Sequence, residues 1–79
     1  MTTTVYLLVN SDLGKEIELI KELQDIPSVT EAHLIYGNYD IILKMQGESM
    51  DQLKEIITAK IRRNDKVRST LTMVVANPN

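Results

Sequence analysis

The chain has 79 residues, a formal net charge of −2, one histidine and no cysteine. This length predicts a single small domain with a marginal core, disulfides are excluded, and a structural zinc site has too few ligands. The acidic balance argues against nucleic-acid binding. Neither a signal peptide nor a membrane span is apparent, so we expect one cytoplasmic domain over residues 1–79. Because its core is marginal, we also expect this domain to self-associate.

The first part of the chain predicts a strand followed by a helix. In residues 4–10 the valines and Leu7 occupy alternate positions, which is the period of a strand. Asp12 is the predicted N-cap of the helix, and Pro27 ends it because the residue before a proline avoids helical geometry. The apolar stripe of this helix consists of Ile17, Leu19, Ile20 and Leu23.

A hairpin is predicted in the middle of the chain. Two strand-like runs, residues 29–36 and 39–46, flank Gly37 and Asn38. Glycine, and to a lesser degree asparagine, accepts a positive φ at little steric cost. We therefore expect a tight turn at these two residues, with the two strands paired side by side.

The last part of the chain predicts a second helix and a fourth strand. Ser49 and Gln52 have capping-box spacing and open the helix. Residues 67–76 are rich in β-branched side chains, which favour a strand. The apolar stripe of the second helix consists of Met50, Leu53, Ile56, Ile57 and Ile61.

The predicted order is β-α-β-β-α-β. Two right-handed crossovers and a central hairpin give a four-stranded antiparallel sheet with both helices on one face. The fold class is therefore α+β, in the ferredoxin-like arrangement.

Alternation along the strands assigns side chains to two faces of this sheet. The set expected under the helices is apolar throughout: Val5, Leu7, Val9, Leu34, Ile41, Leu43, Met45, Leu71, Met73 and Val75. The opposite set is Tyr6, Leu8, His33, Ile35, Ile42, Lys44, Thr70, Thr72 and Val74. A solvated face would be mostly polar, so this second set predicts an interface between two copies of the chain. The alternative is a monomer that tolerates scattered exposed apolar residues.

The hairpin turn contains more aromatic and charged side chains than a turn requires. Tyr36, Gly37, Asn38, Tyr39 and Asp40 place two phenols and a carboxylate beside exposed backbone N–H groups. A turn needs the glycine, but it does not need Tyr39 or Asp40. We interpret the segment as a candidate binding site, although Asp40 also fits a hairpin cap or an ion-pair partner for Lys44.

The chain resembles the C-terminal ligand-binding domain of the Lrp/AsnC transcriptional regulators, the regulation-of-amino-acid-metabolism (RAM) domain. The element order is the same, the family's Gly-x-Tyr-Asp turn is present as residues 37–40, and the last strand matches over residues 67–72. The full-length regulators carry an N-terminal helix-turn-helix domain that has no counterpart in this chain. The chain is therefore most similar to the stand-alone form of the domain, and direct DNA binding is not expected.

The resemblance implies a dimeric α/β barrel, with dimers assembled into rings, often of four dimers. It also implies amino-acid effectors held in clefts between dimers, and no cofactor. The family's turn residues map onto Tyr36, Gly37, Tyr39 and Asp40, and its strand-four contribution maps onto Ser69, Thr70 and Thr72.

An amino-acid ligand presents a carboxylate and an ammonium group to such a cleft. Backbone N–H groups of residues 37–39 can donate to the carboxylate, Asp40 can pair with the ammonium, and threonine hydroxyls can do either. Tyr36 or Tyr39 can wall the pocket.

Three functions are compatible with these expectations. The first is a non-enzymatic module that binds an effector, assembles, and modulates full-length Lrp/AsnC regulators. The second is a small dimeric α/β-barrel enzyme of the monooxygenase or isomerase type, which would need polar groups that the helix-facing set lacks. The third is an assembly domain that binds no ligand.

Overall fold

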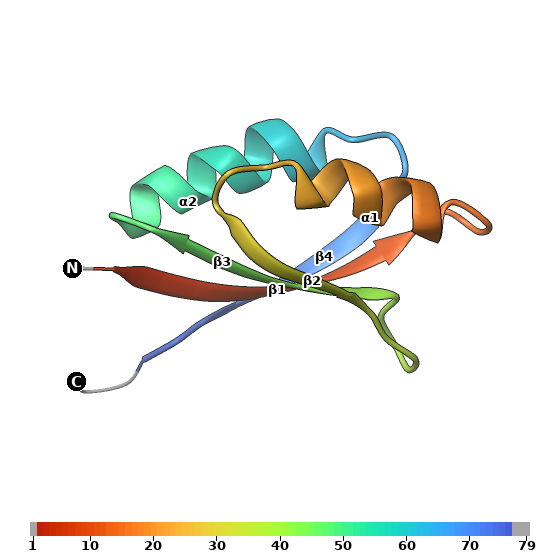
Figure 1. Ribbon diagram of the computed structural model, residues 1–79, viewed down its shortest axis with the longest axis horizontal. Coiled ribbons are helices and arrows are strands. Elements are labelled where there is room, and N and C mark those ends of the chain that lie inside the picture. The colour runs from red at the N-terminus through yellow and green to blue at the C-terminus, as the bar shows by residue number, and fades with distance from the viewer. Residues whose placement is uncertain (1, 77–79) are drawn as a thin grey trace.

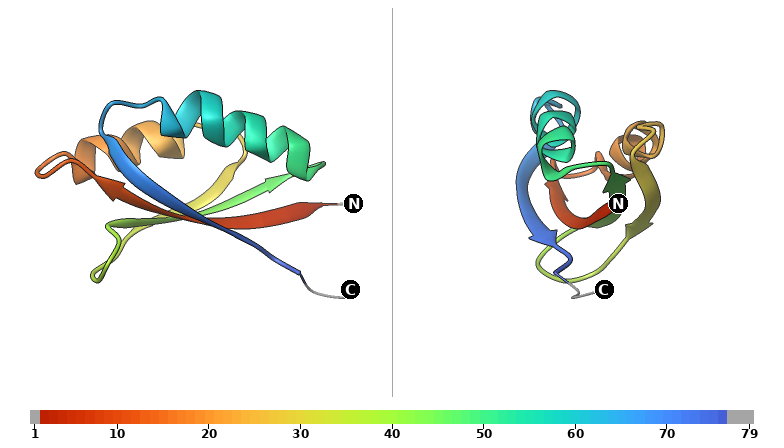
Figure 2. Two further views of the ribbon diagram at one scale, coloured as in Figure 1. Left: turned by 180° about the vertical axis from the view of Figure 1, so that it is seen from behind. Right: turned by 90° about the vertical axis from the view of Figure 1, so that its left-hand side faces the viewer.

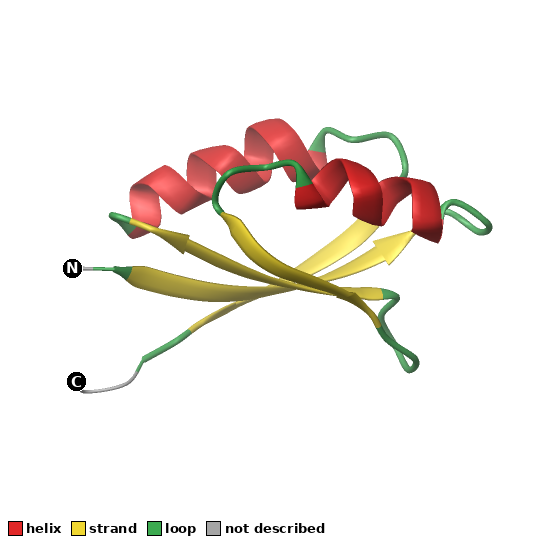
Figure 3. Cartoon of the chain, viewed as in Figure 1, coloured by secondary structure: helices red, strands yellow, loops and turns green. Residues whose placement is uncertain are grey.

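The computed structural model describes residues 2–76 and consists of two helical segments packed on one face of a four-stranded sheet (Figures 1 and 3). The strand order is β2-β3-β1-β4, and all neighbours are antiparallel. This confirms the predicted ferredoxin-like fold. The elements are β1 (Thr3–Ser11), α1 (Glu16–Gln24), β2 (Val29–Leu34), β3 (Ile41–Gly47), α2 (Met50–Ile56), η1 (Ile57–Arg62) and β4 (Val67–Val74).

The core lies between the helices and the two central strands. In register, Val5 of β1 faces Met45 of β3, and Leu7 faces Leu43, so that each pair points toward the helices. All four side chains are fully buried. The helical layer contributes the buried side chains Leu19, Ile20, Leu23, Leu53, Ile57 and Ile61.

The start of α1 differs from the prediction. The helix begins at Glu16, and its N-cap position is Lys15, which makes no side-chain cap. Asp12 lies earlier, in a turn where its carbonyl oxygen accepts from the Lys15 N–H at 3.0 Å. Because the helix starts late, Ile17 falls in its first turn and is 57% exposed, so the predicted stripe is wrong at this position.

The second helix begins as predicted and then widens. The Ser49 hydroxyl accepts from the Gln52 N–H at 3.1 Å, which confirms the cap. After Ile56 the chain continues as the π-helical segment η1. Leu53, Ile57 and Ile61 recur every four residues, and the wider turn helps to keep this row of side chains over the core.

The hairpin connection is longer than a tight turn. Strand β2 ends at Leu34 and β3 begins at Ile41, which leaves a six-residue loop over residues 35–40 that hangs on the side of the sheet away from the helices (Figure 1). Gly37 has a φ of +140°, as its position in the loop requires, but Asn38 does not have a positive φ. The predicted two-residue turn is therefore wrong, and only the glycine carries the unusual backbone conformation.

The predicted face assignment of β4 is also wrong, because the strand contains a β-bulge. Asn10 of β1 pairs with Ser69, but the next residue, Ser11, pairs with Val67, which leaves Arg68 as the extra residue. One extra residue shifts the alternation by one position. Thr70, Thr72 and Val74 consequently share the face of the buried β1 valines and Leu7. Leu71, Met73 and Val75 belong to the opposite face.

The face away from the helices is more apolar than the sequence predicted, because Leu71 and Met73 lie on it. Leu8 lies in register between Ile42 of β3 and Leu71 of β4, and His33 of β2 extends the same row. In Figure 2 no helix or strand of residues 2–76 packs over this side. We call this surface the open face, and its residues are Tyr6, Leu8, Asn10, Glu31, His33, Ile42, Lys44, Leu71 and Met73.

Polar groups gather at the β2 border of the open face. Glu31 lies 3.2 Å from the His33 Nε2 and 3.7 Å from the Lys44 Nζ. The His33 hydrogen bond, followed by the Lys44 charge, lowers the pKa of the Glu31 carboxyl. The open face therefore has an apolar centre and one charged border, the usual arrangement of a protein interface.

A charged cluster ties α1 to the segment before β4. The Lys66 Nζ lies 2.9 Å from Glu22 and 3.5 Å from Glu18, and the Asn64 amide donates to Glu22 at 2.8 Å. The hydrogen bonds from Lys66 and Asn64 lower the pKa of Glu22 from its ordinary 4.5, and the same contact with Glu22 raises the pKa of Lys66 from 10.5.

Replacing Glu22 with glutamine is expected to lower the melting temperature at neutral pH but not in strong acid. The folded pKa of Glu22 lies below 4.5, so its charge stabilises the fold above that pH, and the contribution is lost as the pH falls through the lowered value. The Lys66 contribution is lost only above pH 10.5. Melting curves of wild type, Glu22→Gln and the exposed control Glu55→Gln from acid to neutral pH test this. An equal Glu22→Gln effect in acid and at neutral pH would contradict it.

Candidate functional site

Asp40 is fixed at the junction of the hairpin loop and β1. Its backbone N–H donates to the Val9 carbonyl at 3.0 Å, and its Oδ2 accepts from the Ser11 N–H at 2.9 Å. Lys44, the alternative partner considered from the sequence, contacts Glu31 instead. The Asp40 carboxylate is thus held by backbone groups, with only one of its oxygens engaged by Ser11.

Asp40 borders a polar recess of about 360 Å³ at the end of the open face. The Asn10 amide donates to the Ser69 hydroxyl across this recess at 3.2 Å. We call it the Asp40 recess, and its lining residues are Asn10, Ser11, Asp40, Arg68 and Ser69. The fold therefore brings together two predicted site residues, Asp40 and Ser69. The sequence analysis did not identify Asn10, Ser11 or Arg68, because the bulge that places them is not visible in the residue pattern.

A second recess, of about 340 Å³, lies between the hairpin loop and α1. Tyr36 is fully exposed beside it, and Ile35 follows the end of β2 rather than lying within the strand. The lining residues are Glu16, Ile17, Leu34, Ile35, Tyr36 and Asp40. Asp40 thus joins the two recesses, while Gly37, Asn38 and Tyr39 line neither of them.

Thr70 and Thr72 are separated from Asp40. They border a groove of about 580 Å³ between β4 and the second helical segment, on the helix side of the sheet. Val74, predicted in the dimer interface, also lies there. The bulge at Arg68 is the physical reason, because it shifts the alternation by one position and puts Thr70, Thr72 and Val74 on the helix side. The groove is lined by Met50, Lys54, Ile57, Thr58, Arg62, Thr70, Thr72 and Val74.

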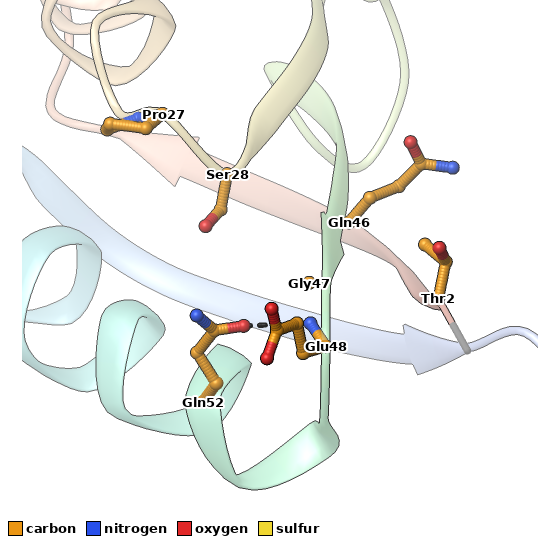
Figure 4. A pocket seen from close by; sticks show the side chains of 7 residues that line it. All are labelled: Thr2, Pro27, Ser28, Gln46, Gly47, Glu48 and Gln52. Carbon is orange, nitrogen blue, oxygen red and sulfur yellow. Dashed lines mark hydrogen bonds between the residues drawn. The ribbon is translucent and has the colours of Figure 1, made fainter.

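A further recess, of about 710 Å³, lies at the other end of β1 (Figure 4). Here Gln52 Oε1 accepts from the Glu48 N–H at 2.8 Å, which completes the cap of α2. None of the predicted site residues lines it. The lining residues are Thr2, Pro27, Ser28, Gln46, Gly47, Glu48 and Gln52. Of its polar groups, Glu48 and Gln52 belong to the helix cap, whereas the Gln46 amide donates to the Thr4 hydroxyl.

Within residues 2–76 there is no group of three or more histidine, cysteine, aspartate or glutamate side chains that could hold a metal ion. In the same part of the chain no helix has the length and apolar character needed to cross a membrane.

Comparison with known proteins identifies relatives of the whole fold. The family model for the Lrp/AsnC ligand binding domain matches residues 4–78. An uncharacterized HTH-type transcriptional regulator of Pyrococcus furiosus is 31% identical over 75 residues, which is 91% of this chain and 50% of the relative. The chain thus spans about half the length of the curated relatives that it matches first.

Comparison with solved structures also identifies relatives that cover nearly the whole chain. FFRP-DM1 superposes with a TM-score of 0.91 at 35% identity, covering 94% of this chain and 99% of the other. AsnC of Escherichia coli superposes with a TM-score of 0.88 at 26% identity, covering 98% of this chain and 53% of that one. A transcriptional regulator from Neisseria meningitidis, solved as an L-Met complex, shares the fold with a TM-score of 0.85 at 13% identity.

The resemblance expected from the turn and the last strand is thereby confirmed, and the match covers nearly every residue of the chain. Several of the relatives are named as transcriptional regulators, and the family model that matches this chain describes a ligand-binding domain. This chain belongs to the Lrp/AsnC ligand binding domain family.

Proposed function

We propose that the chain is a non-enzymatic module that binds a small effector, an amino acid, and couples that binding to assembly. The observation that carries this proposal is the Asp40 carboxylate, which backbone groups hold in place at the border of a polar recess. A fixed carboxylate with one oxygen engaged by Ser11 is suited to an ammonium group. The L-Met complex of the Neisseria regulator motivates the choice of amino acids as the class to test.

The assembly part of the proposal is a homodimer formed through the open face. The row Ile42, Leu8 and Leu71 is contiguous across three strands and apolar. A surface of this kind on a small domain is best stabilised by a second copy, because burial of apolar area contributes free energy that a short chain lacks. Further assembly into a ring of dimers, and partnership with full-length Lrp/AsnC regulators, are extensions of the same proposal.

Binding and assembly are coupled because of where the Asp40 recess lies. Asn10 and Ser69 belong to the open-face side of the sheet and also line the recess. A second copy on that face therefore changes the surroundings of the ligand. By linkage, a ligand that binds better in the assembled state stabilises assembly to the same extent.

The test is a titration with each proteinogenic amino acid, following melting temperature and light scattering. At least one amino acid is expected to raise the melting temperature of wild type. Asp40→Asn, which removes the charge while leaving an acceptor for Ser11, is expected to abolish the shift. Asp65→Asn, an exposed aspartate that borders none of the recesses, is the control.

Two results would contradict the proposal. If no amino acid changes either signal, the chain acts as an assembly domain without ligand. If Asp40→Asn responds as wild type does, the ligand contacts another part of the molecule. Conversion of a bound compound into product would favour the enzyme alternative.

A further inference from the structure

The bulge in β4 changes the direction of one cationic side chain. Regular alternation would place Arg68 on the face opposite Ser69. In the bulge, Arg68 is left without a partner between the pairs Asn10–Ser69 and Ser11–Val67, and both Arg68 and Ser69 line the Asp40 recess. Bulges are common beside binding sites because they redirect a side chain. The extra residue thus brings a guanidinium to a recess that already holds a carboxylate.

The two opposite charges share the recess without neutralising each other. The ion pairs among residues 2–76 involve His33, Lys44 and Lys66, and none of them joins Arg68 to Asp40. Asp40 is held by backbone groups at the end of β1, whereas Arg68 is carried by β4 on the other side of that strand. The space between them is lined by Asn10, Ser11 and Ser69, which offer hydrogen-bonding groups and no apolar side chain.

A recess with one carboxylate held by a backbone N–H, one guanidinium at its border and polar walls is complementary to a zwitterion. A guanidinium can bind a carboxylate through two parallel hydrogen bonds, which a single ammonium group cannot match. We propose that Arg68 binds the carboxylate of the amino-acid ligand whose ammonium pairs with Asp40. This inference rests on the proposed function, and it replaces the expectation from the sequence that backbone N–H groups of residues 37–39 hold the carboxylate.

The assignment predicts which compounds the site rejects. A carboxamide of the same amino acid keeps the ammonium and the side chain but loses the negative charge that Arg68 recognises. Charge-assisted hydrogen bonds contribute roughly 1.5–3 kcal/mol each, which corresponds to a preference for the acid over the amide of about 10- to 100-fold.

The experiment is calorimetric titration with the amino acid that binds most tightly in the panel and with its carboxamide. Wild type is expected to prefer the acid by about 10- to 100-fold. Arg68→Gln is expected to weaken binding of the acid by a similar factor while binding of the amide stays unchanged, so that the preference disappears. Arg68→Lys, which keeps the charge, is expected to fall in between. Arg63→Gln, an exposed arginine that borders none of the recesses, is expected to bind as wild type.

The possible outcomes distinguish failure of this inference from failure of the proposed function on which it rests. If wild type binds an amino acid and Arg68→Gln keeps the same preference for acid over amide, Arg68 is not the carboxylate receptor and only the inference fails. If Arg68→Gln weakens acid and amide equally, its role is structural, and the inference fails as well. If wild type binds no amino acid, both fail.

Discussion

Replacing Leu8 with aspartate is expected to convert the assembled protein into monomers. Leu8 is at the centre of the open face, in register with Ile42 and Leu71. In a two-fold dimer the substitution occurs twice, and each new carboxylate loses its hydration without gaining a partner. We expect the dimer dissociation constant to rise by at least about 100-fold, measured by sedimentation velocity over a range of concentrations.

The matched control is Leu13→Asp, which makes the same chemical change at a side chain that is 94% exposed in the turn before α1. It is expected to assemble as wild type does. Leu71→Lys, in the same row as Leu8, is expected to dissociate the dimer in the same way. If Leu8→Asp and Leu13→Asp sediment identically with wild type, the open face is not the dimer interface.

Replacing Leu43 with alanine is expected to lower the free energy of unfolding by about 2–5 kcal/mol. Leu43 is fully buried between Leu7 of β1 and Ala32 of β2, so the lost methyl groups leave a cavity that the two strands cannot close. The free energy of unfolding of a domain is of order 5–15 kcal/mol, so this substitution would remove a large part of it. Urea denaturation at a fixed protein concentration measures the change.

Leu34→Ala is the control for the core substitution. Leu34 lies on the same face of the sheet, opposite Ile41, but it is 47% exposed at the outer strand. Its truncation is expected to cost about 1 kcal/mol or less, because much of the side chain already contacts water. Equal effects at the two positions would show that the burial pattern assigned to the sheet is wrong.

The sequence was sufficient for the architecture because the signals there are local and periodic. Alternation in β1 and β3 specified which side chains face the helices, and the Ser49–Gln52 spacing specified the start of α2; the structure confirms both. The family followed from the turn and the last strand, and the match over residues 4–78 confirms it.

The phase of β4 could not be predicted from the sequence, since a bulge leaves no mark in the residue pattern. The residue pattern gave Arg68 no role in the site, and it placed Thr70 and Thr72 on the outer face. Only pairing of β4 with β1 shows that Asn10 faces Ser69 while Ser11 faces Val67. That single extra residue changes both the composition of the open face and the membership of the candidate site.

The length of the hairpin connection was missed for a related reason. Gly37 and Asn38 suggested a two-residue turn, but pairing of β2 with β3 stops at Leu34 and Ile41. Beyond that pair the Ile35 N–H still donates to the Asp40 carbonyl at 2.9 Å, and Asp40 is also joined to the end of β1 by hydrogen bonds with Val9 and Ser11. These long-range contacts of Asp40 are not visible in the local turn signal of Gly37 and Asn38.

Effector binding coupled to assembly and the homodimer itself both depend on burial of the apolar row around Leu8 against a second copy. Sedimentation velocity of the wild-type protein at micromolar concentration tests this most directly. We predict a species with at least twice the mass of one chain and no detectable monomer. A stable, folded species of single-chain mass at that concentration would contradict it.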